Sequence, residues 1–400
     1  MQEVYIIDAA RSAVGKYGGA LASIRPDDLA AYVIKALISR NPQIDYTCLD
    51  EVILGAANQA GEDNRNVARM ALLLAGLPNT VPAYTVNRLC ASGLSAIANG
   101  FASIRAGIQD LAIVGGVESM TRAPMVMAKA SSAWDRNPEI YDTTIGWRFT
   151  NIELSKLYHP YTMGETAENV AKRWMITREE QDVFAFESQK KYELAHVNNC
   201  FDKEIVPIKI PLRKGESYIF DKDEHPRLSS LEVLASLKPA FDKEGTVTAG
   251  NSSGINDGAA MLILASEKMV KQFNLKPIAK ILSCAAAGVA PEIMGIGPVP
   301  ATEKALKMAN LVNNNLNLIE LNEAFASQSL ACMHDLSLNP AIVNVNGGSI
   351  AIGHPLGASG ARITNTLLHA MAQRKAKIGL ATMCVGVGQG QAVIFENLNL

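Results

Sequence analysis

Long apolar runs are missing from this 400-residue chain, although 48% of its residues are hydrophobic. No stretch approaches the roughly 18 uninterrupted apolar residues that a membrane-spanning helix needs. The N-terminus has no basic segment ahead of an apolar one, as a secretory signal would have. The C-terminus matches no peroxisomal, ER-retention or prenylation signal. These absences predict a cytoplasmic protein without a membrane partner.

An excess of either charge is also missing: 37 Lys and Arg face 39 Asp and Glu, a formal net charge of −2. Nucleic-acid binding usually needs a basic excess, so we expect no such partner. Cysteines occur singly, at positions 48, 90, 200, 284, 332 and 384. Because no C-x-x-C pair and no Cys/His cluster of zinc-ligand spacing is present, we expect reduced thiols, no disulfide framework and no metal.

Short apolar strands alternate with small-residue-rich helical segments near both ends of the chain, which predicts an α/β fold. The alternation runs twice in the same order. Each series has a strand, a turn, a helix that opens with small residues, and a second strand; these strands are 51–54 and 111–116, then 318–321 and 379–383. We interpret them as two copies of one α/β unit, with chance alternation as the alternative.

Residues 122–250 differ in composition from both copies, with many charges and all three tryptophans. One clear helix is predicted from about 178 to 195, after the capping-box sequence that starts at Thr177. We therefore expect an inserted loop domain at 122–250, an N-terminal unit at 1–121 with 251–270, and a C-terminal unit at 271–400.

Cys90 follows a predicted strand end at 84–86 and a polar turn, and the residues after it take helical spacing. A thiol in the first turn of a helix lies near unpaired backbone N–H groups and the positive end of the helix dipole, which favour thiolate. This position is typical of a nucleophile. A buried structural cysteine is the alternative.

His354 lies in a segment with three glycines in eight residues, 353–360. Pro355 suits a first helical position, so the imidazole is expected at the positive end of a helix. That end disfavours imidazolium, and a neutral histidine is a competent proton acceptor at pH 7. A core histidine is the alternative, but plain packing does not require so many glycines.

Cys384 leaves a predicted strand and enters a glycine-alternating loop that contains Gly386, whose N–H groups can face developing negative charge. A phosphate loop is disfavoured, because a strand at 391–395 follows where a helix would be needed. Asn322 also lies at a strand end. Ligands bind at strand ends in open α/β sheets, so these groups predict one site in which one thiol is a nucleophile, one an acid or base, and the imidazole an activator.

These four segments, with 163–168 (Met-Gly-Glu-Thr-Ala-Glu) and 250–258, resemble the motifs of the thiolase family in order and over essentially the whole chain. The resemblance implies a five-layered αβαβα fold, a loop domain over the active site, and a homodimer or homotetramer. It implies CoA-dependent cleavage of 3-oxoacyl-CoA to acetyl-CoA and a shortened acyl-CoA, as in β-oxidation, or the reverse Claisen condensation. Coenzyme A and acyl-CoA are then co-substrate and substrate, and no cofactor stays bound.

The same resemblance implies a role for each residue. Cys90 is the acylated nucleophile, His354 accepts its proton, and Cys384 is the acid or base at the acetyl-CoA carbon. Asn322, through a water shared with His354, holds one oxyanion, and the backbone N–H groups of Cys90 and Gly386 hold the other. The pantetheine channel is implied at Ser253, Met163, Met294 and Phe325, with Arg227 near the adenine end.

One departure from the motifs of acetoacetyl-CoA-type thiolases bears on the choice of substrate. Thiolases of the acetoacetyl-CoA type place a histidine where this chain has Thr162, and the stretch 142–149 is similar to 3-oxoacyl-CoA and 3-oxoadipyl-CoA thiolases. We therefore expect a broader 3-oxoacyl-CoA substrate. The alternatives are an acetoacetyl-CoA-specific acetyl-CoA acetyltransferase, a β-ketoacyl synthase-like condensing enzyme and a non-catalytic thiolase-like lipid carrier.

Overall fold

The computed structural model describes residues 2–212 and 215–400, and its centre is an eleven-stranded sheet with the order β13-β14-β15-β12-β1-β11-β5-β3-β4. Two short strands, β2 and β8, pair at its side. The N-terminal elements are β1 (Val4–Ser12), β2 (Gly15–Lys16), α1 (Pro26–Arg40), β3 (Glu51–Gly55), α2 (Val67–Leu74), β4 (Ala83–Val86), α3 (Ser92–Arg105) and β5 (Leu111–Ser119).

The C-terminal elements repeat this pattern after β11 (Asn256–Ser266) and α8 (Glu267–Gln272). They are β12 (Ala279–Gly288), α9 (Pro298–Ala309), β13 (Leu318–Leu321), α10 (Ala326–Asp335), α11 (Ser349–Ile352), α12 (Leu356–Arg374), β14 (Ile378–Val385) and β15 (Gln389–Asn397). Strand β3 pairs in parallel with β5, and β13 with β14, so the two predicted copies are present. They join through β1 and β12, which pair at Tyr5–Lys280 and Ile6–Ala279.

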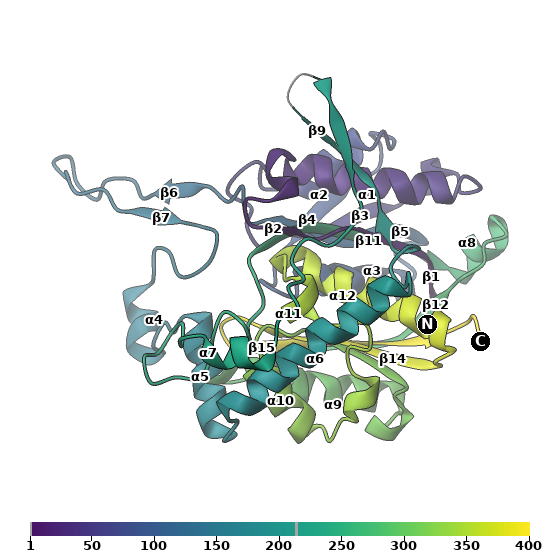
Figure 1. The fold of residues 1–400 in the computed structure, drawn as a ribbon. Coiled ribbons are helices and arrows are strands. Elements are labelled where there is room, and N and C mark those ends of the chain that lie inside the picture. The colour runs from purple at the N-terminus through teal and green to yellow at the C-terminus, as the bar shows by residue number, and fades with distance from the viewer. Residues whose placement is uncertain (1, 213–214) are drawn as a thin grey trace.

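Three large hydrophobic clusters hold together five layers, which Figure 1 shows stacked from top to bottom. The upper cluster packs α1 and α2 on the N-terminal strands, and the lower one packs α9 and α10 on the C-terminal strands. The middle cluster holds α3 and α12 between the two halves of the sheet. The expected αβαβα arrangement is therefore confirmed. The predicted inward face of α3 is also confirmed, because Leu94, Ile97, Phe101 and Ile104 are all buried.

The central helices α3 and α12 approach so closely that their contact requires glycine. A Cβ on Gly360 of α12 would lie 2.3 Å from the backbone nitrogen of Leu94, and one on Gly93 would lie 2.8 Å from the carbonyl oxygen of Gly357. Real Cβ atoms do not come this close to backbone atoms. The small residues that lower helix propensity here thus set the distance between the two repeats.

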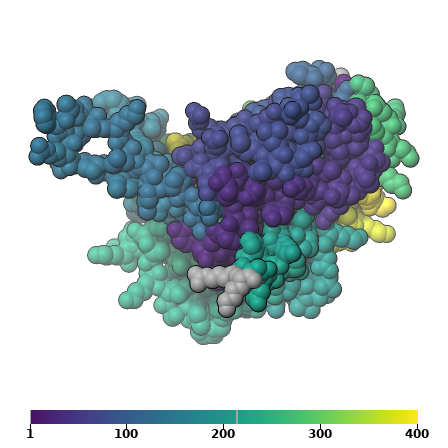
Figure 2. Space-filling view, turned by 90° about the horizontal axis from the view of Figure 1, so that it is seen from above, coloured from purple at the N-terminus to yellow at the C-terminus, as the bar shows by residue number. Residues whose placement is uncertain are grey.

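The segment 122–250 contains β6 (Met125–Met127), β7 (Ile140–Asp142), α4 (Ile152–Leu157), α5 (Met163–Arg173), α6 (Arg178–Val197), β8 (Ile205–Val206), β9 (Ile208–Pro211), β10 (Ser217–Phe220) and α7 (Leu231–Ser236). The hairpin of β6 and β7 forms an arm that projects from the body (Figure 2). Helix α6 begins where predicted, with the Thr177–Glu180 capping box formed on both sides. Within the described ranges, no helix is long and apolar enough to cross a membrane.

Candidate active site

Cys90 lies in a strained turn between β4 and α3. Leu89, directly before it, has a φ of +46°, which is uncommon for a bulky residue. Side-chain bonds hold this turn: Asn87 Oδ1 accepts from the Leu89 N–H at 2.8 Å, and the Ser92 hydroxyl donates to the Leu89 carbonyl at 2.6 Å. Backbone strain of this kind collects at functional sites. Helix α3 begins at Ser92, so Cys90 precedes the helix. The expected position of Cys90 in the first helical turn is therefore wrong.

The resting state of Cys90 also differs from the expected thiolate. Burial, with a smaller contribution from the Glu118 carboxylate, raises the pKa of the Cys90 thiol to about 11. Hydrogen bonds from the backbone N–H groups of Gly386 and of Cys90 itself oppose this rise. The cysteine is therefore a thiol at neutral pH and needs a base, and two N–H donors already face its sulfur.

His354 is buried and neutral, as predicted, but the cause differs from the prediction. Burial, with a smaller contribution from the Arg362 guanidinium, lowers the pKa of His354 to about 3. Pro355 is the cap before α12 and not its first helical residue. The backbone N–H of His354 donates to Asn256 Oδ1 at 2.9 Å, which fixes the residue to β11.

The tautomer of His354 follows from Ser359. His354 Nδ1 lies 2.6 Å from Ser359 Oγ, and that hydroxyl donates its one proton to the Pro355 carbonyl at 2.8 Å. Nδ1 must then carry the hydrogen and donate to Ser359. Nε2 keeps its lone pair, is buried, and has no hydrogen-bond partner among the described residues. The imidazole thus presents a free base.

Asn322 has a similar free group on a fixed side chain. Its Oδ1 accepts from Ser349 Oγ at 2.6 Å, and Ser349 Oγ accepts from Arg362 Nη2 at 2.5 Å. Arg362 is buried and lies 3.7 Å from Glu320 Oε2. The Asn322 oxygen is thus engaged in this series of hydrogen bonds. The Asn322 Nδ2 donor is buried and has no hydrogen-bond partner among the residues that the structure describes. A fixed, unengaged donor can stabilise an oxyanion.

Cys384 lies at the end of β14, buried against apolar side chains that belong to the expected substrate channel. Met294 and Phe325 share its hydrophobic cluster, and Met163 packs against that cluster. Burial raises the pKa of Cys384 well above its ordinary value, and the Cys90 and Cys332 thiols raise it further, so the thiol is held protonated. The second thiol therefore has a proton to donate, and its pKa depends on the charge of the first.

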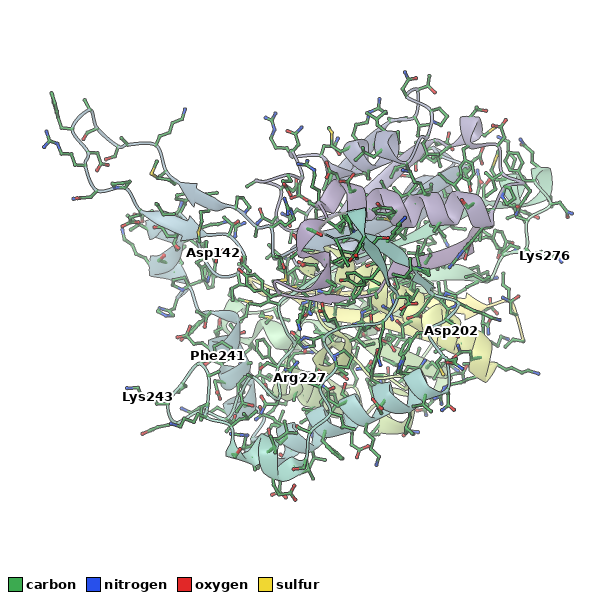
Figure 3. The ribbon with its side chains drawn as sticks, turned by 45° about the horizontal axis from the view of Figure 1, so that its top comes forward. Asp142, Asp202, Arg227, Phe241, Lys243 and Lys276 are labelled. Atoms are coloured by element: carbon green, nitrogen blue, oxygen red, sulfur yellow. The ribbon has the colours of Figure 1, made fainter. Side chains whose placement is uncertain are left out.

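The other two expected binding residues, Ser253 and Arg227, do not line the pocket that opens at Cys90. Ser253 lies next to the Asn322–Phe325 segment, where its N–H donates to the Ala324 carbonyl at 3.0 Å. Arg227, labelled in Figure 3, is exposed, and it donates to the carbonyl of Ala249, four residues before Ser253, at 2.7 Å.

A pocket of about 390 Å³ opens at Cys90, with mostly apolar walls. Its lining residues include Leu89, Cys90, Glu118, Trp147, Arg148, Met163 and Gly386. The sequence argument missed Glu118, Ser359, Ser349, Arg362 and Arg148. Ser359 and Arg148 lay inside segments already singled out, whereas the position of Arg362 in the middle of a helix gave no signal.

Comparison with known proteins gives matches over nearly the whole chain. The model of the thiolase N-terminal domain matches residues 4–268, and that of the thiolase C-terminal domain matches 275–397. The chain is 55% identical over 401 residues to the beta-ketoadipyl-CoA thiolase of Acinetobacter baylyi, with full coverage of both. It is 51% identical, again over full lengths, to the 3-oxoadipyl-CoA/3-oxo-5,6-dehydrosuberyl-CoA thiolase of Escherichia coli.

A solved structure agrees as well: the acetyl-CoA acetyltransferase of Bacillus anthracis superposes with a TM-score of 0.93, 42% identity, and coverage of 100% of this chain and 99% of that one. The chain belongs to the thiolase family. It is an acyltransferase that cleaves 3-oxoacyl-CoA with CoA to acetyl-CoA and a shortened acyl-CoA.

Proposed function

We propose that this enzyme is a thiolase for short 3-oxodicarboxylyl-CoA, with 3-oxoadipyl-CoA as substrate and succinyl-CoA and acetyl-CoA as products. The observation that carries this is full-length identity of 55% and 51% to relatives named for 3-oxoadipyl-CoA, against 48% and 42% to two acetyl-CoA acetyltransferases. Thr162, where acetoacetyl-CoA-type thiolases have histidine, supports the same assignment.

The first half-reaction uses the neutral Cys90–His354 pair. His354 Nε2 takes the thiol proton as the sulfur attacks the C3 carbonyl of the substrate, and the Cys90 and Gly386 N–H groups stabilise the oxyanion. The bond between C2 and C3 then breaks, and its electron pair moves to the enolate of acetyl-CoA. Cys384 protonates that enolate at carbon, and acetyl-CoA leaves with the acyl group still on Cys90.

The second half-reaction returns the protons. The thiol of CoA attacks the acyl–Cys90 thioester and loses its proton, which restores the one that Cys384 gave away. The Cys90 thiolate leaves and recovers its own proton from His354. During the first half-reaction, Asn322 Nδ2 and the protonated His354 Nε2, which has taken the Cys90 proton, stabilise the thioester oxygen of the enolate. The Ser253, Met163, Met294 and Phe325 channel holds the pantetheine arm, with Arg227 near the adenine end.

Domains 1–121 with 251–270, 122–250 and 271–400 remain our division of the chain. We also propose that the protein forms a homodimer or homotetramer in the cytoplasm.

Within the described residues β4 is an edge strand of the large sheet, and its unpaired backbone groups can pair with a strand of another copy. The arm of β6 and β7 carries exposed Met125, Met127 and Ile140, a further apolar surface for a second copy. Light scattering of the purified protein measures the number of copies.

The substrate assignment is tested by thiolysis rates for 3-oxoadipyl-CoA, 3-oxohexanoyl-CoA and acetoacetyl-CoA. The first two substrates share a six-carbon acyl chain and differ only in the terminal carboxylate. We expect the highest kcat/KM for 3-oxoadipyl-CoA. A higher value for acetoacetyl-CoA would favour the acetyl-CoA acetyltransferase instead.

A further inference from the structure

The pocket at Cys90 has two charged lining residues among those that the structure describes, Glu118 and Arg148. Glu118 is fully engaged with the backbone: it accepts from the N–H groups of Ala57 at 2.8 Å, Asn58 at 3.1 Å and Gly357 at 2.7 Å. Burial also raises the pKa of Glu118 to about 7. This carboxylate therefore supports the pocket wall and does not pair with Arg148.

Arg148 is the basic residue of that lining, and it is half-buried. No hydrogen bond or ion pair joins its side chain to any residue in the ranges 2–212 and 215–400. The guanidinium thus has five N–H donors available, in the planar arrangement that matches a carboxylate with two parallel hydrogen bonds.

The backbone around Arg148 is fixed from both sides. Asn58 Nδ2 donates to Thr143 Oγ1 at 2.8 Å, and Trp147 Nε1 donates to the Tyr161 carbonyl at 2.9 Å. Phe149 packs edge-on against Tyr141 of β7, with ring centroids 5.0 Å apart. Figure 3 shows Asp142 just before this stretch, where the chain leaves the arm and turns toward the body. A cation on so well anchored a loop has a defined position at the pocket.

We propose that Arg148 binds the terminal carboxylate of the acyl group while that group is attached to Cys90. The proposal rests on the proposed function, because only a dicarboxylic substrate has this second charge. Attack at C3 of 3-oxoadipyl-CoA leaves carbons 3 to 6 on the sulfur as a succinyl thioester. Its free carboxylate extends from Cys90 into the pocket whose basic lining residue is Arg148. An acyl chain that ends in a methyl group gives Arg148 nothing to bind.

The test compares Arg148→Gln with wild type on 3-oxoadipyl-CoA and 3-oxohexanoyl-CoA. Loss of a charge-assisted carboxylate contact should lower kcat/KM for 3-oxoadipyl-CoA by about 10- to 100-fold. The value for 3-oxohexanoyl-CoA should stay within about twofold, because that chain has no carboxylate to lose. Arg148→Lys keeps the charge without the planar pair of donors. Its kcat/KM for 3-oxoadipyl-CoA should lie between those of wild type and Arg148→Gln.

Arg136→Gln is the matched control. It removes one positive charge from an exposed position in the same 122–150 segment, outside the pocket. The kcat/KM for both substrates should stay unchanged. Equal losses on both substrates with Arg148→Gln would overturn the proposal, because they would indicate a contact with a CoA phosphate or a change in the fold. The KM for CoA, unchanged in the expected case, distinguishes those two sources.

The proposal and the proposed function fail in different ways. A wild-type enzyme that does not favour 3-oxoadipyl-CoA over 3-oxohexanoyl-CoA overturns the proposed substrate, and the carboxylate site with it. A wild-type enzyme that favours it, combined with an Arg148→Gln variant that keeps the same preference, overturns the carboxylate site alone.

Discussion

Ser359 Oγ lies 2.6 Å from His354 Nδ1 while donating its own proton to the Pro355 carbonyl at 2.8 Å. This pair of contacts keeps the hydrogen of the imidazole on Nδ1 and the lone pair on Nε2. A buried histidine without such a partner would be free to present either nitrogen.

Ser359→Ala should therefore slow acylation of Cys90 without weakening substrate binding. We expect kcat to fall by roughly 10- to 100-fold, as for other partners that orient a histidine, with KM nearly constant. Steady-state kinetics with 3-oxoadipyl-CoA measure both. The control is Thr364→Val, which removes a buried hydroxyl with the same kind of bond, to the Gly360 carbonyl at 2.8 Å, elsewhere on α12. A kcat equal in the two variants would contradict the orienting role.

Cys90→Ala should abolish the covalent intermediate. We expect intact-mass analysis to show an acyl adduct on wild type after brief exposure to 3-oxoadipyl-CoA and none on the variant. Turnover should fall at least about 10³-fold, because no other group can replace the nucleophile. Cys48→Ala, a half-buried cysteine outside the pocket, should keep both the adduct and the rate. An adduct of equal yield on Cys90→Ala would place the acyl group elsewhere.

Cys384→Ala should separate the two kinds of chemistry. The variant keeps the Cys90–His354 pair, so acylation by an acyl-CoA should persist in the mass spectrum. Cleavage of the carbon–carbon bond should fall by about 10²- to 10⁴-fold, since the enolate has lost its proton donor. Cys332→Ala serves as control, because that buried thiol bonds to the Gly295 carbonyl at 3.3 Å and takes no part in the mechanism. Equal loss of acylation and cleavage in Cys384→Ala would refute this division.

Glu320 should make the folded protein less stable as pH rises. Burial raises the pKa of this carboxyl from its ordinary 4.5 to about 8, although Arg362 acts in the opposite direction. The folded state therefore binds more protons than the unfolded state between these values, and stability is lost as pH increases through them, by on the order of 1 kcal/mol per pH unit at most.

Melting temperatures of wild type and Glu320→Gln between pH 5 and 8 test this sign. Glutamine resembles the protonated carboxyl that the folded state holds over most of this range, so the melting temperature of the variant should depend less on pH. Exposed Glu303→Gln should retain the wild-type slope. A slope in Glu320→Gln equal to that of wild type would show that another group titrates there.

Gly360→Ala should destabilise the fold by separating the two central helices. The new Cβ would lie 2.3 Å from the Leu94 backbone nitrogen, which cannot move without shifting α3 and the Cys90 turn before it. We expect a cost of roughly 1–3 kcal/mol, as for other overpacked cores, together with reduced activity. Gly288→Ala is the control, since the nearest atom to its Cβ is 3.8 Å away. A melting temperature unchanged in Gly360→Ala would contradict this close packing.

The sequence by itself determined the two α/β repeats, the buried face of α3, the capped helix α6 and the four segments that carry the proposed catalytic groups. These features depend on interactions between residues close in the sequence, because apolar periodicity, helix caps and glycine positions can be identified from a short segment. The family followed from the same segments, because their order and spacing are specific as a set.

Only the tertiary structure decided the protonation states of Cys90 and His354 and the hydrogen-bond partners of Asn322. Cys90 is a thiol because the body of the protein removes water from it, which outweighs the N–H groups that the sequence pointed to. Arg362 lowers the pKa of His354 and supports Asn322 through Ser349, yet these residues come from α12, α11 and the end of β13. Desolvation and contacts between distant segments depend on how the layers stack, and no local pattern records that.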